Sequence, residues 1–114
     1  MEFNDVRIVD KPWGREIHFA VEADYVGKIL EVKKGSRLSL QYHNVKKESM
    51  YVLSGRMKFT LGDEEKIVDE GRSVTIDAKM IHRVEALEDL RIIEVSTNHL
   101  DDIVRLKDDY SRGN

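Results

Sequence analysis

"GSRLSLQYHNVKKESMYVLSG", residues 35–55, sets a glutamine, a histidine and a glutamate among residues that are typical of β-strands. Side chains alternate between the two faces of a strand, so residues 36–43 are predicted to carry a polar row and an apolar row. The polar row is Arg37, Ser39, Gln41 and His43, and the apolar row is Leu38, Leu40 and Tyr42. Two arrangements are open. The apolar row can fill a core and leave the polar row to water, or the polar row can line a cavity.

The rest of the chain also consists of short segments rich in strand-forming residues, separated by Gly, Asp, Asn and Lys clusters. These segments are 13–21, 24–32, 36–43, 49–55, 56–62, 65–71, 72–77, 81–87 and 90–96. Regular short strands with turn signals between them predict an all-β antiparallel sandwich or barrel. Gly62 and Asp63 are predicted to form the tight turn of a hairpin.

The length of 114 residues predicts a single domain, 1–114, with a core over about 12–97. The C-terminal end differs from the rest, because its apolar residues recur at near-helical spacing. These residues are Leu100, Ile103, Val104 and Leu106. The spacing predicts a short helical turn or a tail laid on the barrel, with Asp101 and Asp102 in its first turn.

The composition excludes several classes of function. The chain is 40% hydrophobic and 36% charged, with a formal net charge of −3, which is typical of a soluble globular protein. It has no basic block or aromatic-basic stripe, so no nucleic-acid partner is expected. No apolar run approaches the roughly 18 residues of a membrane span, so no membrane partner is expected. The absence of cysteine excludes disulfides and thiol catalysis and suits the cytoplasm, which is the predicted location.

Four residues are candidate metal ligands. Glu48 follows the turn "NVKK", so a hairpin would bring it beside Gln41 and His43, and His82 opens the later segment "IHRVEA". Two imidazoles, a carboxylate and an amide oxygen suit a divalent ion of intermediate softness, namely zinc, manganese, iron, cobalt or nickel. Such a centre would keep positions open to water or substrate. Any one of these residues alone is more simply explained as a surface side chain, and their spacing decides between the two interpretations.

That spacing resembles the two sequence motifs of the cupin superfamily. The first motif is matched by Gly35, Gln41-Tyr42-His43, Glu48 and Gly55. The second is matched by Gly71, Asp77-Ala78-Lys79 and His82. Gln41 stands where the first histidine of the family usually lies, and Asp77 and Lys79 replace its proline and glycine. The resemblance implies a single-domain cupin, a jelly-roll barrel also described as a double-stranded β-helix.

The glutamine narrows the resemblance further. "SLQYH" at 39–43 resembles the "SLQ-x-H" of the cupin in type II mannose-6-phosphate isomerases, which often form the C-terminal part of a bifunctional enzyme that also makes GDP-mannose. Other matching segments are "KPWG" at 11–14, "YVGKILEVKKGSRLSLQ" at 25–41, "IIEV" at 92–95 and "DDIVRLKDDYSR" at 101–112. The resemblance covers nearly the whole chain and implies metal ligands at Gln41, His43, Glu48 and His82.

The resemblance implies an enzyme, a metal-dependent aldose–ketose isomerase that converts mannose-6-phosphate to fructose-6-phosphate. It would use one divalent ion, with zinc expected first, and a small-molecule sugar phosphate. The implied substrate-binding cations are Arg37, Lys28, Lys46 and Arg105. Lys46 stands where the family usually has arginine, and a lysine keeps the charge but loses the bidentate fork that grips a phosphate.

The catalytic base is sought among the remaining titratable residues. Glu94 lies in the apolar segment "IIEVS", where an isolated carboxylate would have a raised pKa and could act as a base together with Lys46. Glu94 could equally be a polar residue paired inside the barrel. His18 and His99 are expected to be exposed.

Two further functions are open on the same scaffold, because fold does not fix chemistry. One is a metal-dependent dioxygenase or lyase, for which redox chemistry would demand iron. The other is a cupin that binds a sugar without turnover, which the lysine at position 46 favours. Trp13 would report ligand binding if it lines the cavity. The resemblance also implies a homodimer.

Overall fold

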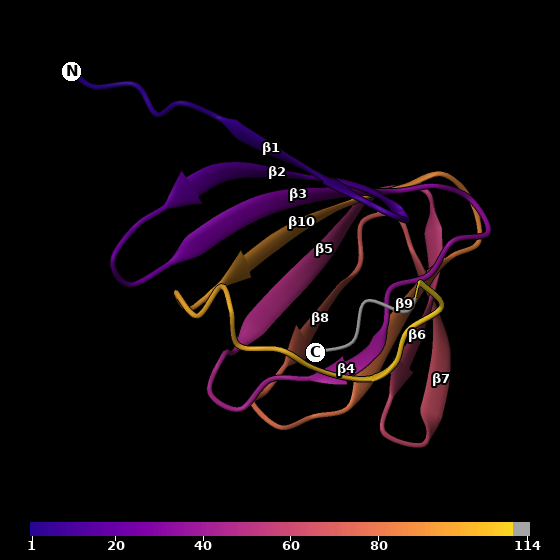
Figure 1. The fold of residues 1–114 in the computed structure, drawn as a ribbon. Coiled ribbons are helices and arrows are strands. Elements are labelled where there is room, and N and C mark those ends of the chain that lie inside the picture. The colour runs from indigo at the N-terminus through magenta and orange to yellow at the C-terminus, as the bar shows by residue number, and fades with distance from the viewer. Residues whose placement is uncertain (111–114) are drawn as a thin grey trace.

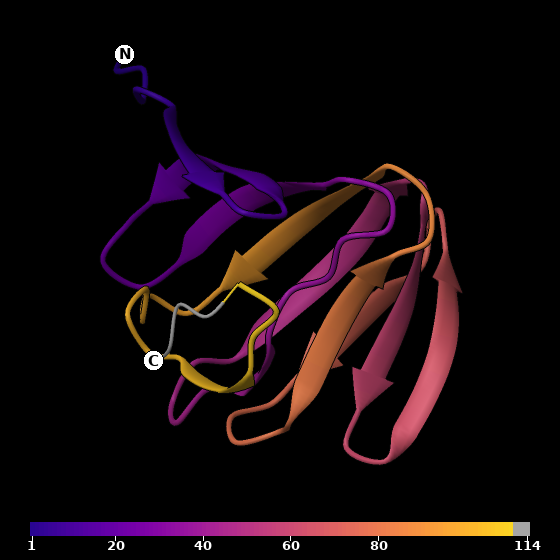
Figure 2. The ribbon, with the colours of Figure 1, turned by 45° about the vertical axis from the view of Figure 1, so that its right-hand side comes forward.

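The computed structural model describes residues 1–110, which form β-strands joined by turns and loops (Figure 1). The strands are β1 (Arg7–Lys11), β2 (Gly14–Val21), β3 (Val26–Val32), β4 (Leu40–Tyr42), β5 (Glu48–Ser54), β6 (Arg56–Leu61), β7 (Glu64–Asp69), β8 (Ser73–Ile76), β9 (His82–Ala86), β10 (Leu90–Ser96) and β11 (Val104–Lys107). They pair antiparallel in two sheets, of order β1-β2-β3-β10-β5-β8 and β11-β4-β9-β6-β7. Figure 2 shows these sheets as the two walls of a sandwich, which confirms the all-β prediction.

The core lies between the sheets because their strands alternate inward apolar and outward side chains. In β10, Leu90 and Ile92 are buried while Arg91 is exposed. In β6, Met57 and Phe59 are buried in the same way. Other members of this core are Leu30, Val32, Val52, Ile76, Val84 and Ala86.

The inward row of β10 changes from apolar to polar along the strand. Leu90 and Ile92 are followed on the same face by Glu94 and Ser96, which are also buried. The neighbouring strand β5 is antiparallel to β10, so its inward row becomes polar toward its start. Val52 is apolar, and Glu48, the first residue of the strand, is charged. One end of the sandwich is therefore an apolar core, and the other end presents buried polar groups to a common space.

Every segment that was predicted as a strand overlaps one. The hairpin prediction is also confirmed, because Leu61 pairs with Glu64 and leaves Gly62 and Asp63 as a two-residue turn. The segment 36–43 is less regular than predicted. Only Leu40–Tyr42 forms a strand there, preceded by an isolated bridge between Arg37 and Glu85.

The predicted C-terminal helical turn is wrong. Residues Val104–Lys107 form strand β11, which pairs with the open edge of β4. Periodic apolar spacing over so short a segment specifies a helix weakly, and backbone hydrogen bonds to an exposed sheet edge outweigh it. Strand β1 was not predicted either. Among residues 1–110 there is no helix with the length and hydropathy that crossing a membrane requires.

Candidate metal centre and ligand pocket

A cavity of about 280 Å³ opens among the inward side chains of the six-stranded sheet, β4 and the segment 100–105. Ligand pockets usually span roughly 300–1,000 Å³, so this cavity lies just below the lower end of that range and suits a small molecule. Of the polar row in the segment 36–43, Ser39, Gln41 and His43 line the cavity. The second of the two arrangements therefore holds from residue 39 onward. Trp13 is part of the core and also lines the cavity.

Three of the four predicted ligands meet at one end of this cavity, where His43 and Glu48 line it and His82 lies against Glu48. The Nε2 atom of His43 lies 3.5 Å from Oε2 of Glu48, and Nε2 of His82 lies 3.4 Å from Oε1 of the same carboxylate. One ligand atom from each residue fits within a span of 4.8 Å, and all three side chains are buried. Glu48 is the first residue of β5 in one sheet, and His82 is the first residue of β9 in the other. The two ligands therefore come from the starts of strands in the two sheets.

The two imidazoles are oriented by backbone carbonyl groups. Nδ1 of His43 bonds to the carbonyl of Asp102, and Nδ1 of His82 bonds to the carbonyl of Met80 at 2.9 Å. A carbonyl oxygen only accepts, so each Nδ1 carries a proton, and in the neutral imidazole each Nε2 presents a lone pair. Burial also lowers the pKa of His43, which favours the neutral imidazole.

These residues fit a divalent cation. Two Nε2 lone pairs face a carboxylate inside the protein, so acceptors face acceptors, and Nε2 of His82 has no hydrogen-bond partner among the described residues. Unsatisfied buried polar groups are costly and rare. A cation between His43, Glu48 and His82 would satisfy all three at once, with the outer nitrogens held as metal-binding histidines require.

The fourth predicted ligand, Gln41, lies next to this group. It pairs with His82 across β4 and β9, is buried, and lines the cavity. Its amide nitrogen lies 3.4 Å from the carbonyl of Ser39, to which it donates, and this leaves the amide oxygen as the atom suited to ligation.

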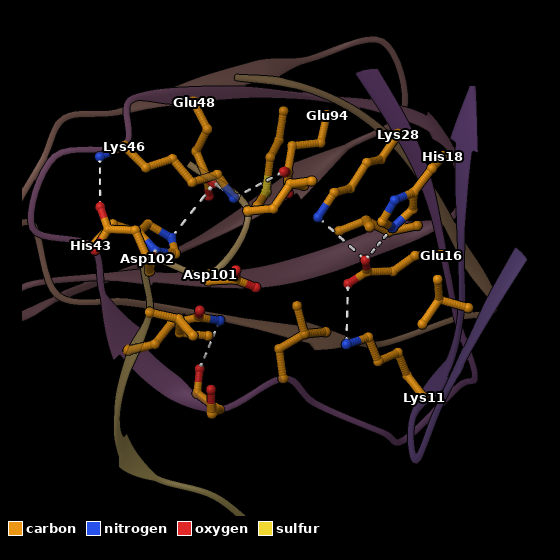
Figure 3. A pocket seen from close by; sticks show the side chains of 18 of the residues that line it. Lys11, Glu16, His18, Lys28, His43, Lys46, Glu48, Glu94, Asp101 and Asp102 are labelled. Carbon is orange, nitrogen blue, oxygen red and sulfur yellow. Dashed lines mark hydrogen bonds and ion pairs between the residues drawn. The ribbon is translucent and has the colours of Figure 1, made fainter. Parts of the chain in front are cut away.

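Lys46 lies between two carboxylates of the pocket rather than reaching for a ligand. Its Nζ atom is 2.8 Å from Oε2 of Glu48 and 3.1 Å from Oε2 of Glu94 (Figure 3). Burial alone would lower the pKa of Lys46, but Glu94 and Glu48 outweigh burial and raise it. For Glu48, burial would raise the pKa, but the ammonium group of Lys46 helps to outweigh burial and lower it. Both groups are therefore ionised at neutral pH.

Glu94 is not the isolated carboxylate that its apolar strand suggested. It is paired with Lys46 inside the barrel, the alternative that the sequence left open. Burial and the nearby charge of Glu48 still raise the pKa of Glu94, and Lys46 offsets this in part. The pair thus holds a carboxylate with a raised pKa at the wall of the pocket.

Two of the remaining predicted cations line the cavity and one does not. Lys28 and Arg105 line it. The prediction that Arg37 shares a face with Gln41 is wrong, because alternation breaks before residue 39 and Arg37 pairs with Asp109 outside the cavity.

A second polar cluster in the pocket was not predicted. Glu16 lies between His18, Lys28 and Lys11, with distances of 2.8 Å to Nε2 of His18 and 3.2 Å to Nζ of Lys28. The expectation that His18 is exposed is wrong, since it is buried on the inner face of β2, whereas His99 is exposed as expected.

Asp102 fixes the loop between β4 and β5, which carries His43 and Lys46. Its carboxylate accepts backbone hydrogen bonds from Asn44, Val45 and Lys46 at 2.9, 2.7 and 2.9 Å. Burial would raise the pKa of Asp102, but these three bonds outweigh it and lower the pKa to about 2. Since its carbonyl also holds His43, the C-terminal segment positions the metal end of the pocket.

Comparison with known proteins identifies the family of the chain. Residues 2–108 match the family model described as "Mannose-6-phosphate isomerase C-terminal". The chain is 36% identical to mannose-1-phosphate guanylyltransferase 2 of Escherichia coli O157:H7, over 96% of this chain and 24% of that protein. It is 35% identical to the xanthan biosynthesis protein XanB of Xanthomonas campestris pv. campestris strain B100, over 93% of this chain and 24% of that protein. The chain therefore spans about a quarter of the length of these relatives.

Solved structures show the same fold at low sequence identity. An RmlC-like cupin from Shewanella frigidimarina superposes with a TM-score of 0.80 at 14% identity, covering 89% of this chain and 94% of that one. KdgF from Halomonas sp. superposes with a TM-score of 0.76 at 20% identity, covering 86% and 89%. The fold is thus a cupin, and the chain belongs to the family of mannose-6-phosphate isomerase C-terminal domains.

Proposed function

We propose that the protein is a metal-dependent isomerase of sugar phosphates, which interconverts mannose-6-phosphate and fructose-6-phosphate. The observation that carries this proposal is the convergence of His43, Glu48 and His82. Two of these residues, His43 and Glu48, line a cavity that Lys28 and Arg105 also line. Membership of the mannose-6-phosphate isomerase C-terminal family supports the substrate class.

The ligand set suits one divalent ion, with zinc expected first and manganese, cobalt, nickel and iron as alternatives. Gln41 would complete the site beside the three residues of the cluster. Only Glu48 brings a negative charge, so the centre would keep a net charge of about +1. Such an ion supplies Lewis-acid polarisation of a carbonyl or hydroxyl oxygen.

The proton transfer is assigned to Glu94 and Lys46. Isomerisation of an aldose to a ketose removes the proton from C2 and returns a proton to C1. A carboxylate with a raised pKa, such as Glu94, matches this task better than an ordinary one. Lys46 holds Glu94 in place and stabilises its ionised form through the contact between Nζ and Oε2.

The substrate phosphate is assigned to cations that line the cavity. Arg105 and Lys28 meet this condition, whereas Arg37 lies outside and is dropped from the proposed site. Lys46 is engaged by Glu48 and Glu94 and is not assigned to the phosphate.

The pairing of Lys46 with Glu48 and Glu94 also favours a second candidate, a cupin that binds metal and sugar phosphate without turnover. One experiment separates the two candidates. Mannose-6-phosphate isomerisation is assayed before chelation, after chelation and after return of each metal, for wild type, His82→Ala and the control His99→Ala. Turnover that is lost on chelation and in His82→Ala, but retained in His99→Ala, supports the isomerase. Metal binding without turnover under any ion contradicts it and supports the binding protein.

We also propose that the chain forms a homodimer through the outer face of the six-stranded sheet. Four large apolar side chains are exposed on this face, namely Phe19, Tyr51, Leu53 and Val95. Extended apolar patches on a surface mark interaction sites. Sedimentation of wild type and Tyr51→Lys tests this, and a wild type that stays monomeric at high concentration contradicts it. The cytoplasmic location stays a prediction.

A further inference from the structure

The second polar cluster has no part in the proton transfer proposed above. Glu16 points into the pocket among Lys11, His18 and Lys28, as Figure 3 shows. Its Oε1 atom accepts from Nε2 of His18 at 2.8 Å and lies 3.2 Å from Nζ of Lys28. Its Oε2 atom has Lys11 at 4.0 Å, beyond hydrogen-bond distance. One oxygen of the carboxylate is thus engaged, and the other keeps acceptor capacity beside the cavity.

The cluster continues a line of alternating charge across the inner face of the sheet. Lys28 of β3 is the register partner of His18 in β2 and of Glu94 in β10. Lys46 then lies between Glu94 and Glu48. Each cation of this line has a carboxylate beside it, so the floor of the pocket between the metal end and Glu16 has little net charge.

Glu16 carries its negative charge at neutral pH. Burial would raise the pKa of Glu16, but Lys28, His18 and Lys11 outweigh burial and lower it. A dianion that approached Lys28 would therefore also approach this carboxylate, and the repulsion would offset the attraction. A hydroxyl group meets no such conflict, because it can donate to Glu16 and accept from Lys28.

We propose that Glu16 and Lys28 form a hydroxyl-recognition site, which binds the neutral polyol part of a sugar and keeps phosphate away from that part of the pocket. This inference rests on the proposed sugar-phosphate function and refines it. The reacting carbons lie at the metal end, the hydroxyl groups lie against Glu16 and Lys28, and the phosphate goes to Arg105 or to Arg7, which also lines the cavity. In this refinement Lys28 binds a hydroxyl group of the sugar and not the phosphate.

Binding measurements test the inference without depending on turnover. Free mannose, mannose-6-phosphate and inorganic phosphate are titrated calorimetrically into metal-loaded wild type, Glu16→Gln and Lys28→Met. The matched control is Glu31→Gln, because Glu31 also pairs with two cations, Arg15 and Arg91, but does not line this cavity. Thermal unfolding of each variant verifies that it is folded.

We expect Glu16→Gln to weaken both mannose and mannose-6-phosphate at least about tenfold, because a hydrogen bond to a charged group is lost. Inorganic phosphate should bind Glu16→Gln as well as or better than wild type, and Glu31→Gln should match wild type with every probe. The inference is overturned if Glu16→Gln leaves sugar binding unchanged, or if Lys28→Met abolishes the binding of inorganic phosphate. It is also overturned if wild type binds neither sugar. Sugar binding that depends on Glu16 in a protein without isomerase activity would refute the proposed reaction and support this site.

Discussion

The Nε2 atom of His82 lies 3.4 Å from Oε1 of Glu48, while its Nδ1 atom is held by the carbonyl of Met80. In the neutral imidazole, a lone pair faces a carboxylate in a buried position, an arrangement that destabilises the protein unless a cation lies between the two atoms. His43 faces the other oxygen of the same carboxylate in the same way. The site suits a positive ion, and the surrounding residues should be sensitive to changes in its charge.

Lys46 is the first test of this charge balance. Lys46→Met leaves Glu48 and Glu94 buried without their shared cation, so we expect a loss of about 3–5 kcal/mol in the free energy of unfolding. The adjacent Lys47→Met is the matched control, because Lys47 forms only an exposed ion pair with Asp77 and should cost less than about 1 kcal/mol. Urea denaturation in the presence of a chelator measures both. Equal stability of the two variants would contradict a structural role for the buried ammonium.

Asp102 should control the metal end of the pocket from the C-terminal segment. Asp102→Ala removes the acceptor of three backbone N–H groups, so we expect a loss of about 2 kcal/mol in stability. Metal affinity should fall at least about tenfold, because the segment that orients His43 is loosened. The exposed Asp63→Ala, in the turn between β6 and β7 and outside the cavity lining, serves as the control. Competition with a chromogenic chelator reports the affinity, and unchanged affinity in Asp102→Ala would show that the segment does not position His43.

Lys79 adopts a backbone conformation that favours glycine. Its φ angle is +69°, and it stands where the cupin motif has glycine. A side chain in the left-handed region costs roughly 1–2 kcal/mol, so Lys79→Gly should raise the free energy of unfolding by up to about 1 kcal/mol after the entropy of the unfolded chain is counted. Lys79→Ala should bring no such gain, since it keeps the Cβ atom. If glycine destabilises the protein, the side chain of Lys79 makes a contact that outweighs the strain.

The lowered pKa of Glu16 predicts a specific dependence of stability on pH. A carboxylate whose folded pKa lies below its ordinary value of 4.5 stabilises the fold above that pH, and the contribution is lost as pH falls through the folded pKa. The stability difference between wild type and Glu16→Gln should thus be largest near neutral pH and shrink below pH 4.5. Urea titrations at several pH values measure this difference. A difference that does not change with pH would mean that the neighbours of Glu16 do not lower its pKa in the folded protein.

The spacing of the motifs predicted which side chains come together, because strand pairing brings residues that are far apart in the sequence next to each other. Gln41 and His82 are 41 residues apart, yet they are register partners across β4 and β9. Alternation also predicted that Ser39, Gln41 and His43 share a face, and all three line the cavity.

The same reasoning failed where the backbone is irregular. Arg37 lies before the regular part of the strand, so the alternation of side chains no longer indicates which face it lies on. The C-terminal residues were misassigned because the free edge of β4, which gives β11 its hydrogen-bond partner, is a property of the assembled sheet.

The cluster around Glu16 could have been found from the sequence. Glu16 and His18 are two residues apart in a predicted strand and so share a face, and Lys28 interrupts the inward apolar row of the next strand. What the sequence could not give is the register that pairs Lys28 with His18 rather than with another residue of β2.

The measurement that tests the central claim most directly is the metal content of the purified, untagged protein after incubation with zinc and removal of unbound ion. Elemental mass spectrometry would compare wild type, His82→Ala and the exposed control His99→Ala. The geometry of His43, Glu48 and His82 predicts close to one ion per chain in wild type and His99→Ala, and a loss of at least about tenfold in affinity in His82→Ala. Wild type that retains no zinc, manganese, cobalt, nickel or iron, or a His82→Ala variant that retains as much metal as wild type, would contradict the assignment.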